Sequence, residues 1–438
     1  MGFALTLGDI TQGIFAVIFL LGVLIFIHEL GHYAMAKLFG VRVETFSLGF
    51  GKRLWGFRRG ETDYRISILP LGGYVKMAGE NPMEERTGDP GEFMSHPRWQ
   101  RFIIAIAGPV MNILLAVAVL TGLYKFHYEP PPVGDVGWVG ANSPAAKAGI
   151  QPGDRILKID GIQNPRWDDV ERRVAYNPNQ PIEVTVRRGD QIVDKRLTPV
   201  PFGPDQVGYA GWEPPDNGVI EQVTPGAPAA KAGLKTQDTI IALNSAPIQS
   251  IHQVLERLQE IKDSPAQLTI LRDGKEMNFT LRAHSMDING DRKYRIGIVP
   301  GRKRVIEQLP LRQAFATALA ECRKNSTALF EIVPKMIRGK NSIKQVSGPV
   351  RIMEVAAVTS RDVYAYTYFM AVLSINLAVF NLLPIPILDG GLMLMLLIES
   401  IMRRDIKQEV KERVYQAAFV FLVLFAAVVI FNDVAKHF

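Results

Sequence analysis

The chain of 438 residues contains only one cysteine, Cys322. One cysteine excludes every disulfide bond within the chain, so its domains must be held together by core packing alone. The cysteine count therefore gives no information about the redox compartment in which the protein works.

Charge is missing from several long apolar stretches. Residues 13–27 contain no charged side chain, and neither do residues 102–124. Hydrophobic residues make up 47% of the chain and the mean hydropathy is +0.09, which is high for a purely soluble protein. Further apolar runs cover residues 414–431 and, with interruptions, residues 364–402. We therefore expect a multi-pass α-helical membrane protein with about four transmembrane helices.

The first apolar run, residues 11–37, could also be interpreted as a cleaved secretory signal peptide. It lacks a basic start and an Ala-x-Ala-like cleavage site, and its apolar part is long for such a signal. A membrane helix is the favoured interpretation.

Lysine and arginine are absent before the first run and frequent just after it. Between the last two runs they are frequent again, at Arg403, Arg404, Lys407, Lys411 and Arg413. Because basic loops tend to stay in the cytoplasm, this pattern places both termini and residues 125–363 on the outer side. The net charge of +7 is explained by these loops, and no nucleic-acid partner is expected.

A sequence repeat occupies the middle of the chain. SPAAKAGIQPGDRILKIDG at residues 143–161 recurs as APAAKAGLKTQDTIIALNS at residues 227–245. Each copy predicts a short helix ended by a glycine, then a turn, a strand, a helix and another strand. The pattern is similar to the PDZ domain, although the second copy has Gln237 where the first has Gly153.

The predicted PDZ pair has two open interpretations. PDZ domains can bind an extended peptide along a sheet edge. However, no Gly-Leu-Gly-Phe loop precedes either copy. The pair either binds a peptide or a substrate's outer domain, or it is a steric cap without a peptide ligand.

The sequence HELGH, residues 28–32, brings ionisable groups into the first apolar run. On a helix, His28 and His32 share one face and can bind one cation, with Glu29 on the neighbouring flank. This H-E-x-x-H pattern is typical of zinc hydrolases, in which the glutamate acts as base on water activated by the metal. Ionisable groups at membrane depth are costly without such a purpose, which argues against a chance match.

Catalytic zinc usually has three protein ligands and one open position. The best third ligand is Asp389 in NLLPIPILDGG, where two prolines break the helix and two glycines allow a tight turn. Irregular backbone at membrane depth is tolerated where it lines a wet cavity, into which Asp389 would be presented. Glu44 and Glu399 are rival ligands, although Glu399 is expected to pair with Arg403.

Three motifs together resemble the site-two protease family of intramembrane zinc metalloproteases, and the match covers essentially the whole chain. They are HELGH at residues 28–32, G-P-x-x-N from Gly108 to Asn112, and N-x-x-P-x-P-x-L-D-G at residues 381–390. The combination is far more specific than any one motif alone. Interhelical hydrogen bonding is the plainer explanation for a polar Asn112 in an apolar helix.

The resemblance implies an assignment of the site residues. One catalytic zinc ion would be bound by His28, His32 and Asp389. Glu29 would be the general base, and Asn381 would contact the substrate. The substrate would be a single-pass membrane protein, such as an anti-sigma factor already trimmed by a first protease, or a remnant signal peptide.

The resemblance also implies a location in the bacterial inner membrane, in contact with lipid. The PDZ pair and both termini would lie on the periplasmic side, with the zinc site toward the cytoplasm. The alternative belongs to a different functional class. It is a membrane-anchored PDZ scaffold or chaperone with a structural or inactive metal site. A structural zinc normally has four protein ligands, so an intact Glu29 and an Asp389 in broken helix favour the protease.

The stretch DYRISILPLGGYVKM, residues 63–77, predicts a β-hairpin that is interrupted around Gly72 and Gly73. The family is described as having a re-entrant β-element at this place. A strand edge that pairs with unwound substrate would expose the carbonyl that a helix hides. The residues expected to contact substrate are Ile66, Ile68, Gly72, Gly73 and Tyr74. A plain cytoplasmic hairpin that packs on the membrane is the alternative.

The expected fold is a multi-pass α-helical membrane protein with a membrane-associated β-element and two soluble α+β PDZ domains. The expected parts are residues 1–125 with two membrane helices and the β-element, residues 126–203 and 204–300 as the PDZ domains, residues 301–363 as an amphipathic helical linker, and residues 364–438 with the last two membrane helices.

Overall fold

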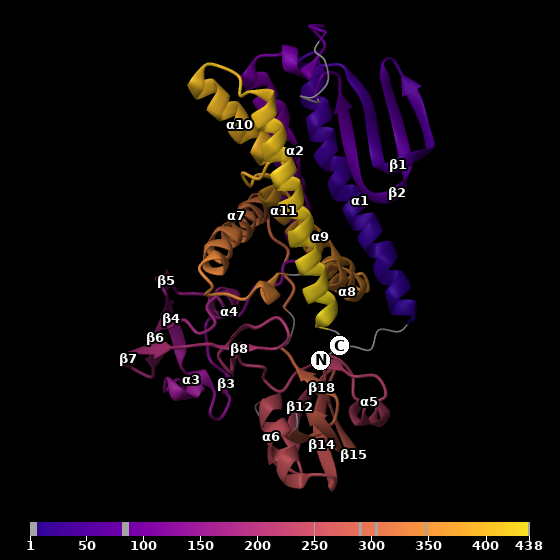
Figure 1. Ribbon diagram of the computed structural model, residues 1–438. Coiled ribbons are helices and arrows are strands. Elements are labelled where there is room, and N and C mark those ends of the chain that lie inside the picture. Colours follow the sequence, from indigo (N-terminus) through magenta and orange to yellow (C-terminus); the bar gives the residue numbers. More distant parts are fainter. Residues whose placement is uncertain are drawn as a thin grey trace. The chain divides into compact units, whose positions relative to one another are not determined.

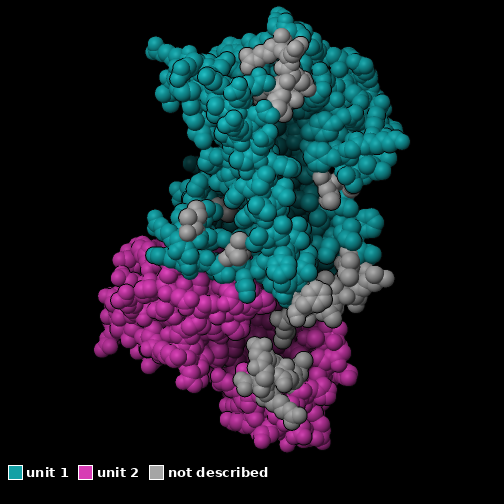
Figure 2. Space-filling model, viewed as in Figure 1, with its two compact units in different colours: residues 1–128, 307–438 teal, residues 129–306 magenta. Residues whose placement is uncertain are grey.

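The computed structural model describes residues 7–80, 87–248, 250–288, 291–302, 305–346 and 348–436. The chain forms two compact units, which Figure 2 distinguishes by colour. Unit 1 consists of Met1–Tyr128 and Glu307–Phe438, and unit 2 consists of Glu129–Ile306. The N–H of Tyr128 donates to Glu307 O at 2.9 Å, and the N–H of Glu307 donates to Tyr128 O at 2.8 Å. Unit 1 is thereby closed by backbone hydrogen bonds at the two points where unit 2 is inserted.

Unit 1 is mainly helical (Figure 1). Within its described residues, four segments are long and apolar enough to cross a membrane: Thr11–Phe39, Arg98–Phe126, Val363–Asn381 and Gln408–Ala435. The interrupted apolar run of residues 364–402 is divided between α9 and α10. The helices are α1 Leu7–Leu38, α2 Arg98–Phe126, α7 Leu311–Ile337, α8 Pro349–Thr359, α9 Val363–Asn381, α10 Asp389–Met402 and α11 Gln408–Ala435, with 3-10 turns η1 Phe93–Ser95 and η2 Ile343–Gln345.

Helices α1 and α2 approach each other very closely at Gly31. A Cβ atom on Gly31 would lie 2.4 Å from the carbonyl oxygen of Ala107 and 2.8 Å from Cγ of Met111. Only a residue without a side chain allows the two backbones to come so near. This crossing brings the polar face of α1 against the middle of α2.

The β-element of unit 1 is a bent sheet of two long strands. Residues 43–48 pair with residues 73–77, and residues 45–48 also pair with residues 63–66. The outer part of the sheet is formed by residues 53–59 pairing with residues 62–67. The strands are β1 Val43–Arg59 and β2 Thr62–Met77.

The predicted hairpin of residues 63–77 is wrong in its pairing partner. Its two arms are residues 63–66 and 73–77, and they do not pair with each other. Residues 45–48 of β1 lie between the two arms and pair with both. The chain reverses at Gly60 instead. Alternation of side chains in a sequence specifies which residues share a face of a strand, but it carries no information about the neighbouring strand. The β structure itself is present where the pattern predicts it.

Helix α7 packs its small side chains against the membrane helices of unit 1. Ala314, Ala318 and Cys322 are buried in one cluster with residues of α2 and α9. Leu311 and Phe315 remain exposed. The segment expected to be amphipathic is therefore a helix with a small-residue face inward and large apolar side chains outward.

Unit 2 contains two halves with the same order of elements. Each half has a four-stranded sheet, β5-β4-β6-β7 in the first and β13-β12-β14-β15 in the second. The elements are β3 Trp138–Val139, α3 Pro144–Lys147, β4 Arg155–Ile159, β5 Ile162–Gln163, α4 Trp167–Ala175, β6 Ile182–Arg188, β7 Gln191–Leu197, β8 Val200–Phe202, β9 Val207–Tyr209, β10 Trp212–Glu213, β11 Ile220–Val223, α5 Pro228–Ala232, β12 Thr239–Leu243, β13 Ala246–Pro247, α6 Ile251–Ile261, β14 Pro265–Arg272, β15 Lys275–Arg282, β16 His284–Ile288, β17 Asp291–Arg295 and β18 Ile298–Pro300.

The two halves also repeat a buried ion pair. Arg188 Nε donates to Asp154 Oδ1 at 2.7 Å, and Arg272 Nε donates to Asp238 Oδ1 at 2.7 Å. Both aspartates are almost completely buried. A charge of this kind is tolerated inside a fold because its partner and backbone donors satisfy it.

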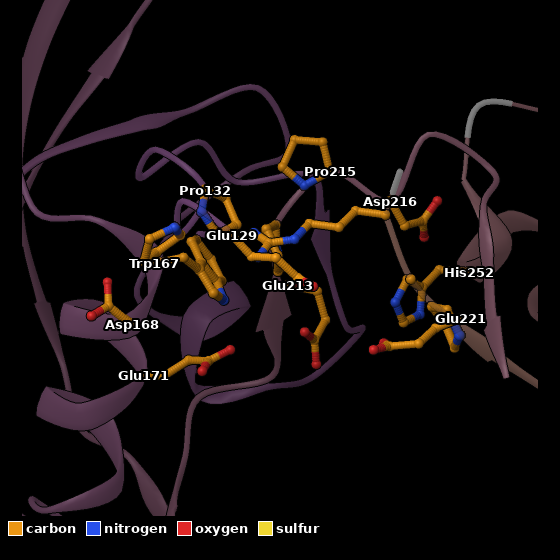
Figure 3. A pocket seen from close by; sticks show the side chains of 15 residues that line it. Glu129, Pro132, Trp167, Asp168, Glu171, Glu213, Pro215, Asp216, Glu221 and His252 are labelled. Atoms are coloured by element: carbon orange, nitrogen blue, oxygen red, sulfur yellow. The ribbon is translucent and has the colours of Figure 1, made fainter. Parts of the chain in front are cut away.

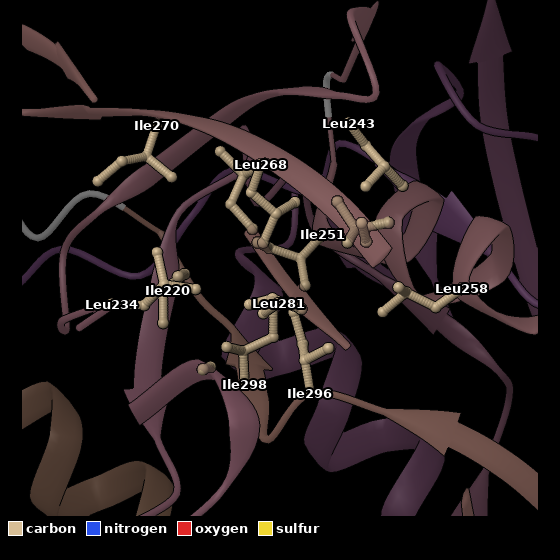
Figure 4. Packing of buried hydrophobic residues seen from close by; sticks show 14 of the residues in the cluster. Ile220, Leu234, Leu243, Ile251, Leu258, Leu268, Ile270, Leu281, Ile296 and Ile298 are labelled. Atoms are coloured by element: carbon tan, nitrogen blue, oxygen red, sulfur yellow. The ribbon is translucent and has the colours of Figure 1, made fainter. Parts of the chain in front are cut away.

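Alternating apolar residues of the strands form the core of each half. In β6 every second residue from Ile182 to Val186 is buried, as expected for a strand with one face on a core. Figure 4 shows the core of the second half, which contains Ile220, Leu234, Leu243, Ile251, Leu258, Leu268, Ile270, Leu281, Ile296 and Ile298.

Candidate metal centre and active site

The two histidines of the HELGH sequence converge on one point. His28 and His32 lie one turn apart on α1, and their Nε2 atoms are 3.2 Å from each other. Their exposed fractions are only 6% and 8%. Two imidazole nitrogens so close and so well buried are an arrangement that a shared cation stabilises.

Asp389 completes this group from the far end of the sequence. Its Oδ2 lies 3.2 Å from His28 Nε2, and its Oδ1 lies 3.5 Å from His32 Nε2. Ligands of a tetrahedral zinc, with bonds of about 2.0–2.1 Å, are separated by about 3.3–3.4 Å. The three separations fit a zinc ion with these three ligands and one open position.

Asp389 is presented by a break between α9 and α10. The backbone before it places Ile387 at φ +88°, a conformation that β-branched residues rarely adopt. A Cβ atom on Gly390 would lie 2.4 Å from Leu382 O, and one on Gly391 would lie 2.3 Å from Ile385 O. The two glycines therefore allow α10 to start tightly against the broken segment, with Asp389 in its first turn.

Hydrogen bonds on the far side of each imidazole fix its orientation. His32 Nδ1 donates to the carbonyl oxygen of Ile104 at 2.8 Å, which leaves its Nε2 lone pair free to bind a metal. His28 Nδ1 lies 3.3 Å from Nδ2 of Asn112, whose Oδ1 has no hydrogen-bond partner among the described residues. If the amide of Asn112 is turned by half a rotation, its Oδ1 accepts from His28 Nδ1–H. Oδ1 then has a partner, and no amide nitrogen faces the imidazole nitrogen. Ser374 Oγ donates to the backbone oxygen of Asn112 at 2.8 Å, which links α9 to this contact.

The role of Asn112 as a support for His28 was not foreseen from the sequence. Two signals were present, a polar side chain in an apolar helix and the G-P-x-x-N motif, but neither names the partner of Asn112. Gly108 belongs to the same motif, which does not indicate why its missing side chain matters. A Cβ atom there would lie 2.3 Å from His32 Nε2 and 2.8 Å from His28 Cε1, so its missing side chain makes room for both rings.

Glu29 lies beside the histidines and faces strand β2. Its carboxyl interacts with the backbone N–H of Val75, and a Cβ atom on Gly73 would lie 3.4 Å from Glu29 Cγ. The side chain is half-buried. A carboxylate in this place is next to the metal position and next to a strand edge, as a base for hydrolysis at that edge requires.

Asn381 lies at this centre, but only some of the β2 residues that were expected to contact substrate lie next to it. Asn381 Nδ2 lies 3.2 Å from His28 Nε2, at the metal position itself. Gly73 lies against Glu29, whereas Ile66 pairs with Leu48 on the other side of β1 and is 42% exposed. The remaining residues expected at the site are Ile68, which is 53% exposed, Gly72, where a Cβ atom would overlap the Phe50 ring, and Tyr74, which stacks on Phe50.

Neither rival ligand joins the metal group. Glu44 Oε2 accepts from Lys76 Nζ at 2.8 Å. Glu399 is 1% exposed and pairs with Lys411 at 2.6 Å, so its expected pairing with Arg403 is wrong. The local sequence suggested Arg403 because it is one turn away, but Lys411 in α11 supplies the partner. Within the described residues, the only set of ionisable groups with metal-ligand spacing is His28, His32 and Asp389.

A cavity of about 610 Å³ opens beside Asp389. It is large enough for several water molecules, and hydrolysis of a peptide bond consumes one. Its charged lining consists of Lys76, Glu80, Arg101, Asp389, Glu399, Lys411 and Glu412.

A second cavity, of about 450 Å³, lies within unit 2 (Figure 3). Its lining is acidic, with Glu129, Asp168, Glu171, Glu213, Asp216 and Glu221 around Trp167, His252 and Arg302. Burial and the nearby carboxylates of Glu171 and Asp216 raise the pKa of Glu213 to about 7. This cavity holds no group with metal-ligand spacing among its described residues.

Comparisons with known proteins agree with the geometry of unit 1. The sequence pattern of Peptidase family M50 matches residues 16–425. The chain is 33% identical over 448 residues to "Regulator of sigma-E protease RseP" of Escherichia coli K12, covering 95% of this chain and 97% of that protein. It is 32% identical to the protein of the same name from Salmonella typhimurium 14028s, covering 96% and 98%. It is 29% identical to a "Putative zinc metalloprotease" of Vibrio cholerae, covering 98% and 99%.

Proposed function

The chain belongs to peptidase family M50, the zinc metalloproteases of the site-2 type, and from this premise we propose that it cuts the membrane segment of single-pass proteins. The observation that carries the proposal is the 3.2–3.5 Å spacing of His28, His32 and Asp389 next to Glu29. We propose one zinc ion per chain, bound by these three ligands.

Glu29 is the general base of the proposed reaction. Zinc bound at this site would lower the pKa of a coordinated water and polarise the scissile carbonyl. Glu29 takes a proton from the attacking water and passes it to the leaving nitrogen. One C–O bond forms, one C–N bond breaks, and one water molecule is consumed. Asn381, at the metal position, is placed to donate a hydrogen bond to the oxygen on which negative charge develops.

The substrate is held as a strand along residues 73–77 of β2. One edge of this strand pairs with residues 43–48 of β1. The opposite edge has no strand partner among the described residues, and it carries the Val75 N–H beside Glu29. Pairing there would unwind a helical substrate and expose the peptide bond. Gly73 and Tyr74 belong to this edge, whereas Ile66, Ile68 and Gly72 support the sheet or contact substrate farther out.

The names of the relatives support the proposed substrate class. Their name, regulator of sigma-E protease, supports an anti-sigma-factor-like single-pass protein that another protease has already trimmed. Remnant signal peptides are a second substrate of the same form. Four apolar helices among the described residues, together with these relatives, support a location in the inner membrane. We propose that both termini and unit 2 lie on the periplasmic side and the zinc site toward the cytoplasm.

Unit 2 supplies the selection of substrates in this proposal. Its two halves share one order of elements and a repeated Arg–Asp pair, and both features support two domains of the same kind. They act either by binding a peptide along a sheet edge or by excluding proteins with bulky outer domains.

The Glu29→Gln variant tests the proposed function. Glutamine keeps the size of the side chain but accepts no proton from water, so turnover of a reconstituted single-pass substrate should fall by about 10²- to 10⁴-fold while zinc content stays unchanged. Glu61→Gln is the control, because Glu61 is exposed and pairs with Lys37. Unchanged turnover in the Glu29 variant would instead favour a membrane-anchored scaffold whose metal site is structural or inactive.

A further inference from the structure

The strand edge next to Glu29 has a defined end. The N–H of Ala78 donates to the carbonyl oxygen of Arg42 at 2.9 Å, so it points toward the β1 side. Successive N–H groups of a strand point in opposite directions, and the N–H of Met77 therefore points away from β1. It donates to Oε2 of Glu80 at 3.2 Å.

The same alternation places the N–H of Val75 on this outer edge. The carboxyl of Glu29 interacts with that N–H, in agreement with its direction. Gly73, two residues earlier, presents its N–H on the same side. The edge that faces the site thus carries the N–H groups of Gly73, Val75 and Met77 in this order. Val75 N–H interacts with the proposed base Glu29, and Met77 N–H, at the end of the edge, is bound by Glu80.

Glu80 is held in this position by a tight turn. Its own N–H lies 3.4 Å from Met77 O, and Gly79 before it has φ +61°. A Cβ atom on Gly79 would lie 2.8 Å from Glu92 Cβ, so the turn depends on glycine. The side chain of Glu80 lines the same cavity as Asp389.

We propose that Glu80 is a positioning residue that ends the substrate-pairing edge at Met77 and thereby fixes which peptide bond of the substrate lies at Glu29. This inference rests on the proposed function. A strand paired only through backbone groups can slip by two residues without changing the faces of its side chains. By occupying the Met77 N–H, the Glu80 carboxyl blocks pairing one step farther along the edge. Its effect is on register, and Glu80 takes no part in bond making or breaking.

The position of the cut tests this role directly. Glu80→Gln keeps an oxygen that accepts from Met77 N–H, so a reconstituted substrate should be cut at the wild-type bond at the wild-type rate. Glu80→Leu keeps the volume but removes the acceptor, so mass spectrometry should find a new product displaced by two residues. Glu61→Gln is the control and should cut as wild type, because Glu61 is exposed and pairs with Lys37, away from residues 73–77.

Two results with the Glu80 variants would overturn the proposal. One is an unchanged single cut in Glu80→Leu. The other is loss of cleavage in Glu80→Leu with zinc retained, because Glu80 would then act in the reaction itself.

A second measurement needs no change at Glu80. Amide hydrogen exchange, resolved to single residues, is followed in the Glu29→Gln protein with and without bound substrate. Binding should slow exchange at Gly73 and leave Met77 unchanged, since Glu80 already occupies that N–H. New protection at Met77, or none at Gly73, contradicts the proposal. Failure of the proposed function is a separate result, because it appears as full cleavage by the Glu29→Gln protein.

Discussion

The side chains nearest the candidate metal are oriented by groups on their far sides. The carbonyl of Ile104 fixes the ring of His32, and Asn112 contacts the ring of His28. Supports of this kind set which imidazole nitrogen is protonated and which one faces the metal. Gly108 contributes by having no side chain, since both rings lie where its Cβ atom would be.

Gly108→Ala should weaken metal binding without unfolding α2. The added methyl group would lie 2.3 Å from His32 Nε2, and the ring is held from behind by Ile104, so the ligand atom must move. We expect zinc affinity to fall on the order of 10- to 100-fold, as for the loss of a supporting contact.

Gly122→Ala on the same helix is the control, because a Cβ atom there meets nothing within 4 Å. It should keep zinc and gain slightly in stability, since alanine favours helix over glycine. Competition with a zinc chelator measures both variants, and equal affinities would refute the steric explanation.

At the scale of elements, α10 and α11 are joined by a buried ion pair. Glu399 in α10 pairs with Lys411 in α11 at 2.6 Å, and Glu399 Oε1 also accepts from the N–H of Ile406 at 3.0 Å. Both side chains are almost fully buried. This pair holds the start of α11 against the helix that carries Asp389.

Lys411→Met should destabilise the protein by about 3–5 kcal/mol, because it leaves the carboxylate of Glu399 buried without its amine. Lys407→Met is the control, since Lys407 is exposed, and its effect should stay within about 0.5 kcal/mol. Denaturant unfolding in detergent micelles measures both. A loss in Lys411→Met no larger than in the control would show that the pair contributes nothing to α10–α11 packing.

The sequence predicted the parts of this site that depend on local spacing. The H-E-x-x-H spacing placed two imidazoles on one helical face, and the prolines and glycines around Asp389 marked a break in helix. Contacts that depend on tertiary packing were missed. The partner of Glu399 is Lys411, which lies in the next helix, and the arms of residues 63–77 pair with β1 because of the sheet order.

At the scale of the whole molecule, the unit that carries the candidate metal centre is assembled from both ends of the chain. Unit 1 combines Met1–Tyr128 with Glu307–Phe438, and hydrogen bonds between Tyr128 and Glu307 close it. The insertion of unit 2 therefore leaves the metal centre within one compact unit. In the proposed function, hydrolysis depends on bringing Asp389 to His28 and His32 across this long sequence separation.

Zinc content of the purified protein and of its Asp389→Ala variant tests this account most directly. Mass spectrometry of the metal, after dialysis against zinc-free buffer, should find about one zinc ion per wild-type chain and almost none in the variant, because two histidines alone bind zinc weakly. Equal zinc in both proteins would contradict the account, since the ion would then be held without the carboxylate that defines the site.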